Sequence, residues 1–295
     1  MRAPGLIGSL PGTAAGWRTT LARSFRQAGL PEPERDAGLL LAEALGRDRV
    51  FILAHPEHPP TAAQSVLLEA WRRRRTGGEP VQYILGWREF WRDRFAVSPA
   101  VLIPRPETEL LVERGAVRLA GRERPRILEL AAGSGCVGLS LLREVPGAVL
   151  LALDISPAAM AVARSNARAL GLEPRFWGLV ADGPAPFGAA AAERFDLVVA
   201  NPPYIPDGQL DRLPVEIRDW EPRLALAGGA DGLDFHRAWL APALALVRPG
   251  GAVLMEFGDG QEVPLRELLS ATGQPFQFHA DLSGRPRLYE LERRP

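Results

Sequence analysis

The sequence predicts an α/β protein with a mostly parallel sheet, preceded by a small helical domain. Three observations lead to this prediction: apolar residues at helical spacing before residue 78, an aromatic and β-branched stretch after it, and strands that alternate with helices from Arg126 onward. With 295 residues, 46% of them apolar, the chain can bury a sizeable core.

The first part of the chain is predicted to be helical. In "ERDAGLLLAEALG", Leu40, Leu41 and Leu45 share one stripe, and Gly46 ends the helix. "TAAQSVLLEAWRRRR" begins with Thr61 as a cap and ends in four arginines. This run of positive charge suits the dipole of a helix C-terminus better than it suits a nucleic-acid patch.

The chain is predicted to divide into four parts. Residues 1–15 are rich in Gly and Pro and are expected to be disordered, and residues 16–78 form the helical domain. The spacing in "EFWRDRFAVSPAVLI" predicts a β-hairpin, within a linker over residues 79–104. Residues 105–295 form the sheet domain, with strands expected at 126–130, 149–153, 176–180, 195–200, 251–256, 275–280 and 287–292.

Composition excludes several classes of protein. Formal charge is zero, with 35 basic and 35 acidic residues, so we expect no direct nucleic-acid partner. The single cysteine, Cys136, allows no disulfide within the chain and fits a reducing compartment. No apolar run approaches the roughly 20 residues of a membrane span, and Pro4 and Pro11 interrupt any secretory signal. We expect a cytoplasmic monomer with no membrane partner and no metal site.

The stretch "RILELAAGSGCVGLSLL" predicts a strand, a glycine-rich turn and a helix. Gly133 and Gly135 let the backbone turn tightly and approach a ligand, and the start of the helix offers free N–H groups. With Gly138 the stretch also matches G-x-G-x-x-G, which is weak evidence alone because dinucleotide and S-adenosylmethionine (SAM) sites both use such loops.

Two carboxylates accompany this loop. Asp154 ends the next strand, 19 residues after Gly135, where an acid can accept hydrogen bonds from two ribose hydroxyls. Ser156 can cap the helix that follows, which leaves Asp154 free for the ligand. Glu129 lies inside the first strand, where it could order the turn or hold an ammonium, and this favours SAM over a dinucleotide.

The stretch "FDLVVANPPYIPDG" places Asn201 directly after a buried strand. An amide nitrogen is a poor nucleophile, and its two N–H groups are the only hydrogen-bond donors by which it can be oriented. Two acceptors directed at these groups can therefore orient the nitrogen toward an electrophilic methyl group. Asn201 offers its side-chain oxygen and Pro202 its carbonyl, while Pro203 stiffens the turn. Tyr204 can stack on the planar group.

The chain resembles the glutamine N5-methyltransferases that act on peptide-chain release factors and ribosomal proteins. The resemblance runs from about Gly29 to Arg293 and rests on "GGEPVQYILGWREFW", "VLIPRPETELLVE", Asn-Pro-Pro-Tyr and "EIRDWEPRLALAGGADGLDFHR". It implies a Rossmann-like, seven-stranded class I methyltransferase domain joined to its helical domain by the hairpin. It also implies SAM as methyl donor, with S-adenosylhomocysteine as product, and the Gln of a Gly-Gly-Gln loop in class I release factors as acceptor. The helical domain would recognise that partner.

The resemblance also implies the roles of individual residues. The catalytic segment is Asn201, Pro202, Pro203 and Tyr204. Cofactor contacts are implied for Glu129, Ala131, Ala132, Gly133, Ser134, Gly135, Asp154, Ile155, Asp182, Gly183 and Asn201. Substrate contacts are implied for Leu102, Arg105, Glu107, Thr108, Asn201, Pro202 and Tyr204.

The chain departs from the family pattern at several places, two of which bear on the path of the loop and on the adenine site. Ala131 stands where the family has a glycine, and we expect alanine to be tolerated there only if its φ is negative. Gly183 follows Asp182 where relatives often have a large side chain near adenine, so adenine contacts are expected to be weaker or to come from elsewhere.

Other functions remain open on the residues alone. A ribosomal-protein glutamine is one alternative acceptor. An exocyclic amino group of adenine or cytosine in nucleic acid is another, with residues 72–75, 122, 124 and 126 as a basic face. A dinucleotide oxidoreductase would leave Asn201 without a role, and a SAM-binding scaffold would not turn over.

Overall fold

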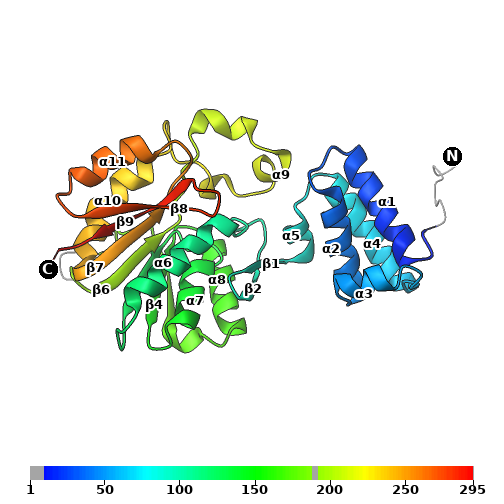
Figure 1. Cartoon of the computed structure of the whole chain (residues 1–295), viewed down its shortest axis with the longest axis horizontal. Helices are drawn as coiled ribbons and strands as arrows, with labels where there is room; N and C mark the ends of the chain where they lie inside the picture. The colour runs from blue at the N-terminus through cyan, green and yellow to red at the C-terminus, as the bar shows by residue number, and fades with distance from the viewer. Residues whose placement is uncertain (1–9, 188–191, 295) are drawn as a thin grey trace. The chain divides into compact units, whose positions relative to one another are not determined.

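The computed structural model describes residues 10–187 and 192–294, and it divides into a first unit that ends at Gly86 and a second that begins at Trp87 (Figure 1). Most of the segment predicted to be disordered, residues 1–9, lies outside the described residues. The linker boundaries expected from the sequence, residues 79–104, stay a prediction.

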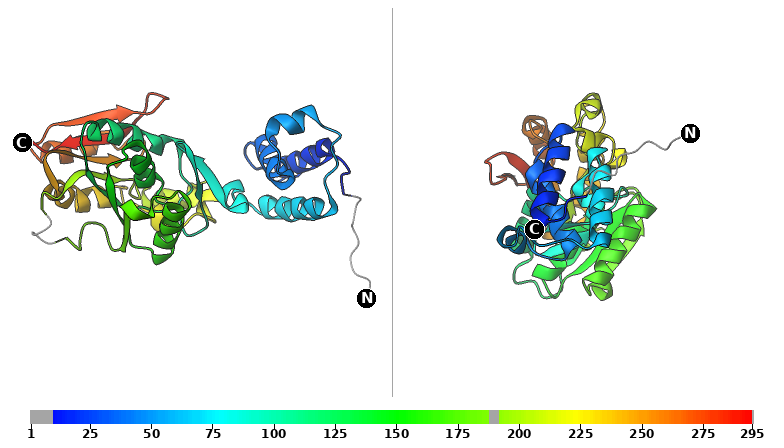
Figure 2. Two further views of the ribbon diagram at one scale, coloured as in Figure 1. Left: turned by 90° about the horizontal axis from the view of Figure 1, so that it is seen from below. Right: turned by 90° about the vertical axis from the view of Figure 1, so that its right-hand side faces the viewer.

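The first unit consists of helices gathered around one apolar core (Figure 2). They are α1 (Ala14–Gln27), α2 (Pro33–Leu45), α3 (Arg49–Ala54), α4 (Ala62–Thr76) and α5 (Val81–Leu85). Local chemistry sets their ends as predicted. Gly46 ends α2 with a φ of 61°, and Thr61 and Gln64 form a capping box at the start of α4. Trp17, Leu21 and Phe25 of α1 are fully buried in this core.

The four arginines that end α4 are each paired with a carboxylate. Arg72 and Arg73 both bond Glu69, and Arg74 bonds Glu79. The guanidinium of Arg75, with a side chain only 2% exposed, reaches Asp36 of α2 at 2.8 Å. These ion pairs tie the run to carboxylates of the same helical unit.

The second unit opens with the predicted hairpin, β1 (Trp87–Phe90) and β2 (Asp93–Ala96), which pair antiparallel. A 3₁₀ turn, η1 (Pro106–Thr108), and helix α6 (Glu109–Leu119) follow. Between hairpin and turn, the segment from Ala100 to Pro104 reaches the cavity described below.

The predicted seven-stranded sheet is confirmed. Its strands are β3 (Arg126–Leu130), β4 (Val149–Asp154), β5 (Phe176–Val180), β6 (Phe195–Ala200), β7 (Val247–Glu256), β8 (Phe276–Ala280) and β9 (Pro286–Glu292). Their order is β5-β4-β3-β6-β7-β9-β8, parallel except for the pairs that involve β9. Strand β7 begins four residues before the predicted start and has a break in register before Ala252, because it includes the Pro-Gly-Gly turn.

Helices cover both faces of the sheet (Figure 1). Helices α6, α7 (Cys136–Glu144) and α8 (Pro157–Ala169) bury one face, and α10 (Asp234–Leu246) and α11 (Glu262–Ser270) bury the other. Short turns η2 (Glu173–Arg175), η4 (Asp207–Arg212), α9 (Val215–Arg218) and η5 (Arg223–Ala225) lie between the larger elements. In the described ranges, no helix combines the length and the hydropathy needed to cross a membrane.

The strand order creates a crevice at the carboxyl end of β3. From β3 the chain moves outward through β4 to β5, and then returns to add β6 on the other side of β3. In open α/β sheets, ligands bind at such a point because the loops there diverge to opposite faces. The loops after β3, β4, β5 and β6 therefore meet at one edge.

Candidate active site

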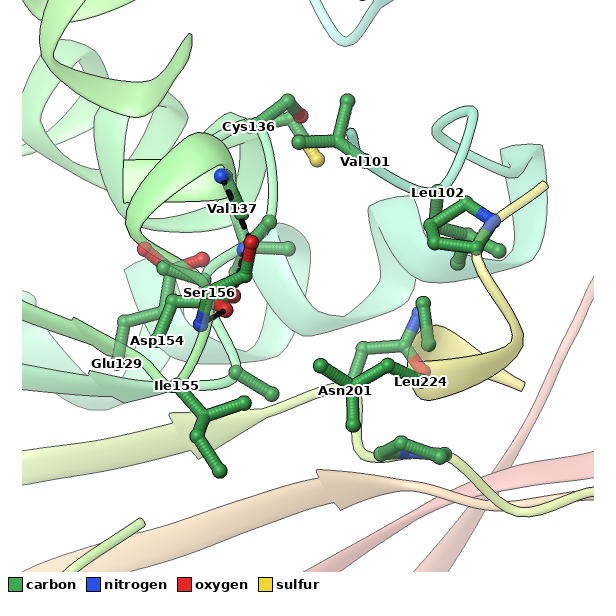
Figure 3. A pocket seen from close by; sticks show the side chains of 18 of the residues that line it. Val101, Leu102, Glu129, Cys136, Val137, Asp154, Ile155, Ser156, Asn201 and Leu224 are labelled. Carbon is green, nitrogen blue, oxygen red and sulfur yellow. Dashed lines mark hydrogen bonds between the residues drawn. The ribbon is translucent and has the colours of Figure 1, made fainter. Parts of the chain in front are cut away.

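A cavity of about 270 Å³ lies at this edge of the sheet (Figure 3). Among the residues expected from the sequence, those that line it are Leu102, Thr108, Glu129, Ala131, Ala132, Gly133, Ser134, Asp154, Ile155, Asp182, Gly183, Asn201 and Pro203. Arg105, Glu107, Gly135, Pro202 and Tyr204 are not among its lining residues. Figure 3 shows Glu129, Asp154 and Ile155 on one side and Asn201 with Leu224 on the other.

The glycine loop turns more sharply than the sequence suggested. Ala132 donates its N–H to the carbonyl of Leu153 in β4 at 2.9 Å, so the chain must reverse direction while it still bonds the neighbouring strand. Ala131 consequently has a φ of 52°, and the expectation that alanine here requires a negative φ is wrong. The surrounding hydrogen bonds hold this alanine in the left-handed region at a cost of about 1–2 kcal/mol.

Gly135 has a role different from that of Gly133. Its φ is 76°, and a Cβ on it would approach Ala163 of α8 to 3.2 Å. Gly135 therefore permits close packing of the helix start against α8, whereas Gly133 faces the cavity. The N-cap residue of α7, Gly135, has no side chain to cap the helix, and the N–H of the third residue, Gly138, is taken by Glu129.

Asp154 is held by backbone groups on both sides. Its Oδ2 accepts from the N–H of Gly133 and its Oδ1 from that of Ser156, each at 2.8 Å. Ser156 caps α8 as expected, by accepting from Ala159, but Asp154 is not free as the sequence suggested. The carboxylate ties the glycine loop to β4, and the second lone pair of each oxygen remains for a ligand. Burial raises the pKa of Asp154.

Glu129 is a buried carboxylate with an unused acceptor. Its Oε1 accepts from the N–H of Gly138 at 3.2 Å, while Oε2 has no hydrogen-bond partner. A Cβ at position 138 would lie 2.4 Å from Oε2, so the third glycine of the loop is needed to admit this side chain. Burial raises the pKa of Glu129 to about 8. An unsatisfied buried oxygen of this kind fits a cationic ligand group.

Asn166 of α8 joins the hairpin to the glycine loop. Its Oδ1 accepts from the N–H of Ala96, and its Nδ2 donates to the carbonyls of Ala96 and Ser134 at 3.1 and 2.9 Å. The side chain is 2% exposed, and three of its hydrogen-bonding positions are used. It sets the position of the segment after the hairpin relative to the loop, and the sequence had not singled it out.

A hydrogen-bond network orients Asn201. Its Nδ2 donates to Thr108 Oγ1 at 3.1 Å, and the Thr108 hydroxyl bonds Glu256 at the end of β7. Because the amide N–H₂ is engaged with Thr108, its Oδ1 is available as an acceptor. Glu256 is 3% exposed, and burial raises its pKa to about 7. Thr108 lines the cavity and bonds Asn201, and its predicted contact with a substrate stays a prediction.

Tyr204 also belongs to this network. Its hydroxyl donates to Glu256 at 3.3 Å, and its carbonyl accepts from Gln261. Burial raises the pKa of the phenol, which keeps it protonated. The role of Tyr204 as a lid over a substrate stays a prediction.

Arg105 braces the wall of the cavity from behind. It pairs with Glu221, whose Oε2 also accepts from the N–H of Ile103 at 3.2 Å. Glu221 has a side chain only 1% exposed, and the residues after it, Pro222 and Leu224, line the cavity. This pair fixes two loops more than 100 residues apart in sequence, while Glu107 is exposed nearby.

Two aromatic residues of α10 complete the cavity where Gly183 leaves space. A Cβ on Gly183 would lie 2.3 Å from Trp239 Nε1, so the indole occupies the room that a side chain at 183 would need. Phe235 packs edge-on against Trp239 at 4.9 Å between ring centres, and both line the cavity. The spacing of these aromatics by one helical turn was visible in the sequence, but nothing there linked them to Gly183.

The cavity combines the Asp154 carboxylate, a carboxylate oxygen of Glu129 without a hydrogen-bond partner, an aromatic wall and the amide oxygen of Asn201. These groups fit the parts of SAM together with an amide that receives its methyl group. Cys136 also lines the cavity, but burial raises its pKa and keeps the thiol un-ionised. Within the described residues, no group of three or more His, Cys, Asp or Glu could hold a metal ion.

Comparison with known proteins supports the same interpretation. Residues 17–86 match the PrmC N-terminal domain, and residues 106–215 match the methyltransferase small domain. The chain is 44% identical over 271 residues to the release factor glutamine methyltransferase of Rhodospirillum rubrum, covering 92% of this chain and 82% of that protein. It is 41% identical to the release factor glutamine methyltransferase of Bradyrhizobium diazoefficiens, with 94% of each chain covered. The protein of that name in Moorella thermoacetica is also 41% identical, over 92% of this chain and 95% of its own length.

A solved structure shares the fold alone. The hMettl16 catalytic domain, in complex with MAT2A 3'UTR hairpin 6, superposes with a TM-score of 0.54 at 15% identity. The match covers 78% of this chain and 81% of that one.

We predict that Ala131→Gly stabilises the protein. Glycine removes the strain of the positive φ, and this gain exceeds the entropy that glycine adds to the unfolded chain, for a net gain of up to about 1 kcal/mol. Denaturant unfolding of both variants measures the difference. Ala132→Gly, in the same loop at a residue without positive φ, is the control and is expected to lose stability. A less stable Ala131→Gly would show that the loop is not strained.

The raised pKa of Glu129 predicts a pH-dependent stability. Between the ordinary value of 4.5 and about 8 the unfolded carboxyl releases its proton while the folded one keeps it, so stability falls as pH rises through this range. In Glu129→Gln the side chain at this position is an amide, which is neutral at every pH, so the variant lacks this contribution to the pH dependence. Its free energy of unfolding relative to the parent chain is expected to rise between pH 5 and 8, by an amount on the order of a few kcal/mol. An unchanged difference across that range would contradict the burial of an uncompensated carboxylate.

Proposed function

The chain belongs to the family of release factor glutamine methyltransferases, and from this premise we propose that it transfers a methyl group from SAM to a glutamine side-chain amide. The acceptor is the Gln of the Gly-Gly-Gln loop in class I peptide-chain release factors. The observation that carries this proposal is the Asn201 amide, whose N–H₂ is engaged by Thr108 so that its oxygen serves as an acceptor at the cavity.

The donor site lies over β3, β4 and β5. Glu129 Oε2 receives the ammonium of the methionine moiety, Asp154 the ribose hydroxyls, and the Phe235–Trp239 wall the adenine ring. SAM supplies an electrophilic methyl group on a sulfonium centre. In this proposed arrangement the ammonium and ribose sites lie between adenine, on the side of β5, and the acceptor amide, on the side of β6, and the strand order supports it.

The acceptor site orients the substrate nitrogen. Asn201 Oδ1 and the Pro202 carbonyl each accept one N–H of the glutamine amide, so that the nitrogen lone pair points at the methyl group. These acceptors also stabilise the positive charge that develops on nitrogen as the carbon–sulfur bond breaks and the carbon–nitrogen bond forms. Thr108 and Glu256 hold Asn201 in this orientation.

No strong base is needed in this reaction. The methylated amide carries a positive charge until it loses its proton, and it is acidic enough to release that proton to water. The products are N5-methylglutamine, S-adenosylhomocysteine and one proton. The proposal includes a cytoplasmic location, which the single reduced cysteine supports.

We predict that Asn201→Ala lowers the rate of methylation by about 10²–10³-fold, because one preorganised acceptor for the reacting amide is lost. Mass spectrometry of a class I release factor after incubation with SAM measures the added methyl and maps it to the Gly-Gly-Gln glutamine. SAM binding by calorimetry is expected to change little. Methylation that persists at the parent rate would exclude Asn201 as the acceptor. A methyl group found instead on the glutamine of a ribosomal protein would mean that the ribosomal protein, and not the release factor, is the substrate.

A second prediction concerns the aromatic wall. Trp239→Leu removes a stacking surface and is expected to weaken SAM binding about tenfold, whereas Trp239→Phe retains most of the affinity. Trp177→Leu is the matched control, because Trp177 is 54% exposed on β5 and does not line the cavity. Calorimetry gives the affinities, and thermal unfolding checks that each variant is folded. If Trp239→Leu and Trp177→Leu lose the same affinity for SAM, adenine does not stack on Trp239.

A further inference from the structure

The first unit contains a hollow that the methyl-transfer site does not use. It has a volume of about 490 Å³ and lies where α1, α2 and α3 meet. Its floor is formed by the buried residues Ala22 and Ile52. Its rim carries four arginines and one carboxylate: Arg18, Arg23, Arg26, Arg49 and Glu34. Figure 1 shows the three helices beside one another.

The positive charge of this rim is largely uncompensated. Arg26 pairs with Glu34 of α2, which leaves three guanidinium groups. Among the described residues, Arg18, Arg23 and Arg49 make no ion pair or side-chain hydrogen bond. The run at residues 72–75 differs, since each of those arginines has a carboxylate partner. Three like charges around one hollow repel one another, so folding stability does not explain their placement.

Arg49 is placed there against local preference. It is the first residue of α3, where the helix dipole disfavours a positive charge. Its guanidinium lies over Gly38 in the middle of α2, with Nε 3.7 Å from where a Cβ would stand. A Cβ at that position would be in ordinary van der Waals contact with the arginine, so the guanidinium packs directly against α2 at the rim of the hollow.

Apolar side chains extend the surface along α3. Val50 is 73% exposed and Leu53 is 64% exposed, and Leu53 also lines the hollow. A cationic rim above an apolar floor, with exposed aliphatic side chains beside it, complements a protein segment that carries carboxylates together with aliphatic residues. A nucleic acid is less well matched, because no aromatic side chain lines the hollow to stack on a base.

We propose that this hollow binds an acidic segment on the surface of the protein substrate. The inference rests on the proposed function, in which that substrate is a class I release factor. The glutamine loop occupies the cavity of the second unit, and the acidic segment occupies the hollow of the first. Two contacts on one polypeptide raise the effective concentration of the glutamine at the methyl donor, so the hollow lowers KM without taking part in the chemistry.

The test compares two triple variants of the full chain with the same change in net charge. Arg18→Gln, Arg23→Gln and Arg49→Gln together neutralise the rim of the hollow. The control replaces three arginines of the same unit that lie outside it: Arg35→Gln, Arg47→Gln and Arg73→Gln. Each protein is assayed with SAM on a full-length class I release factor and on a short peptide that contains Gly-Gly-Gln.

For the rim variant we expect KM for the release factor to rise about tenfold at low salt, with kcat and the peptide kinetics unchanged. The difference shrinks as salt increases. The control variant is expected to stay within about twofold of the parent chain. If the peptide turns over too slowly to measure, calorimetric binding of the release factor to the parent, rim and control proteins gives the same comparison.

The outcomes separate the two proposals. If the parent chain methylates neither substrate, the proposed function fails. If it methylates the release factor and the rim variant matches the control, the inference about the hollow is overturned. Equal rises in KM for protein and peptide would also overturn it, because they would indicate damage to the second unit. RNA that binds the parent chain but not the rim variant, without an effect on KM, would assign the hollow to nucleic acid instead.

Discussion

Ala132 donates its backbone N–H to Leu153 just beyond the end of β3, and the geometry of the donor site follows from this bond. The chain has to reverse within two residues while it remains attached to β4. The reversal forces a positive φ on Ala131 and on Gly133, and it brings the N–H of Gly133 to Asp154. One carboxylate then connects the loop, the strand and the start of α8. The strain in a single alanine is retained because many hydrogen bonds around it favour the turn.

Two buried carboxylates lie in different hydrogen-bond environments. Glu129 lines the cavity and has an oxygen without a hydrogen-bond partner among the described residues. Glu256 also has an Oε2 without a hydrogen-bond partner, but it is bonded by Thr108 and Tyr204, and through Thr108 it orients the amide of Asn201. The first arrangement leaves an acceptor oxygen for a ligand, while the second uses hydrogen bonds to fix the orientation of a neutral acceptor.

The arginines of the first unit divide in the same way. Those near the end of α4 form ion pairs with carboxylates of their own unit, and the pair between Arg75 and Asp36 connects α4 to α2. Of the four around the hollow, Arg26 pairs with Glu34, while Arg18, Arg23 and Arg49 have no carboxylate partner in the part of the chain that the structure describes. A formal charge of zero for the whole chain therefore conceals a local excess, which composition cannot reveal.

The sequence by itself determined the elements and the class of the site. Strand ends fell within a few residues of prediction, and the caps at Thr61 and Ser156 form as expected, because these features depend on neighbours a few residues away. Only the tertiary structure decided how the site is completed. Trp239 of α10 meets Gly183, which follows β5, and Thr108 of η1 meets Asn201, which follows β6, because a helix and a turn distant in sequence pack at the edge where these strands end. The tertiary structure also decided the positive φ of Ala131. A hydrogen bond to β4 sets this angle, whereas an alanine by itself favours a negative φ.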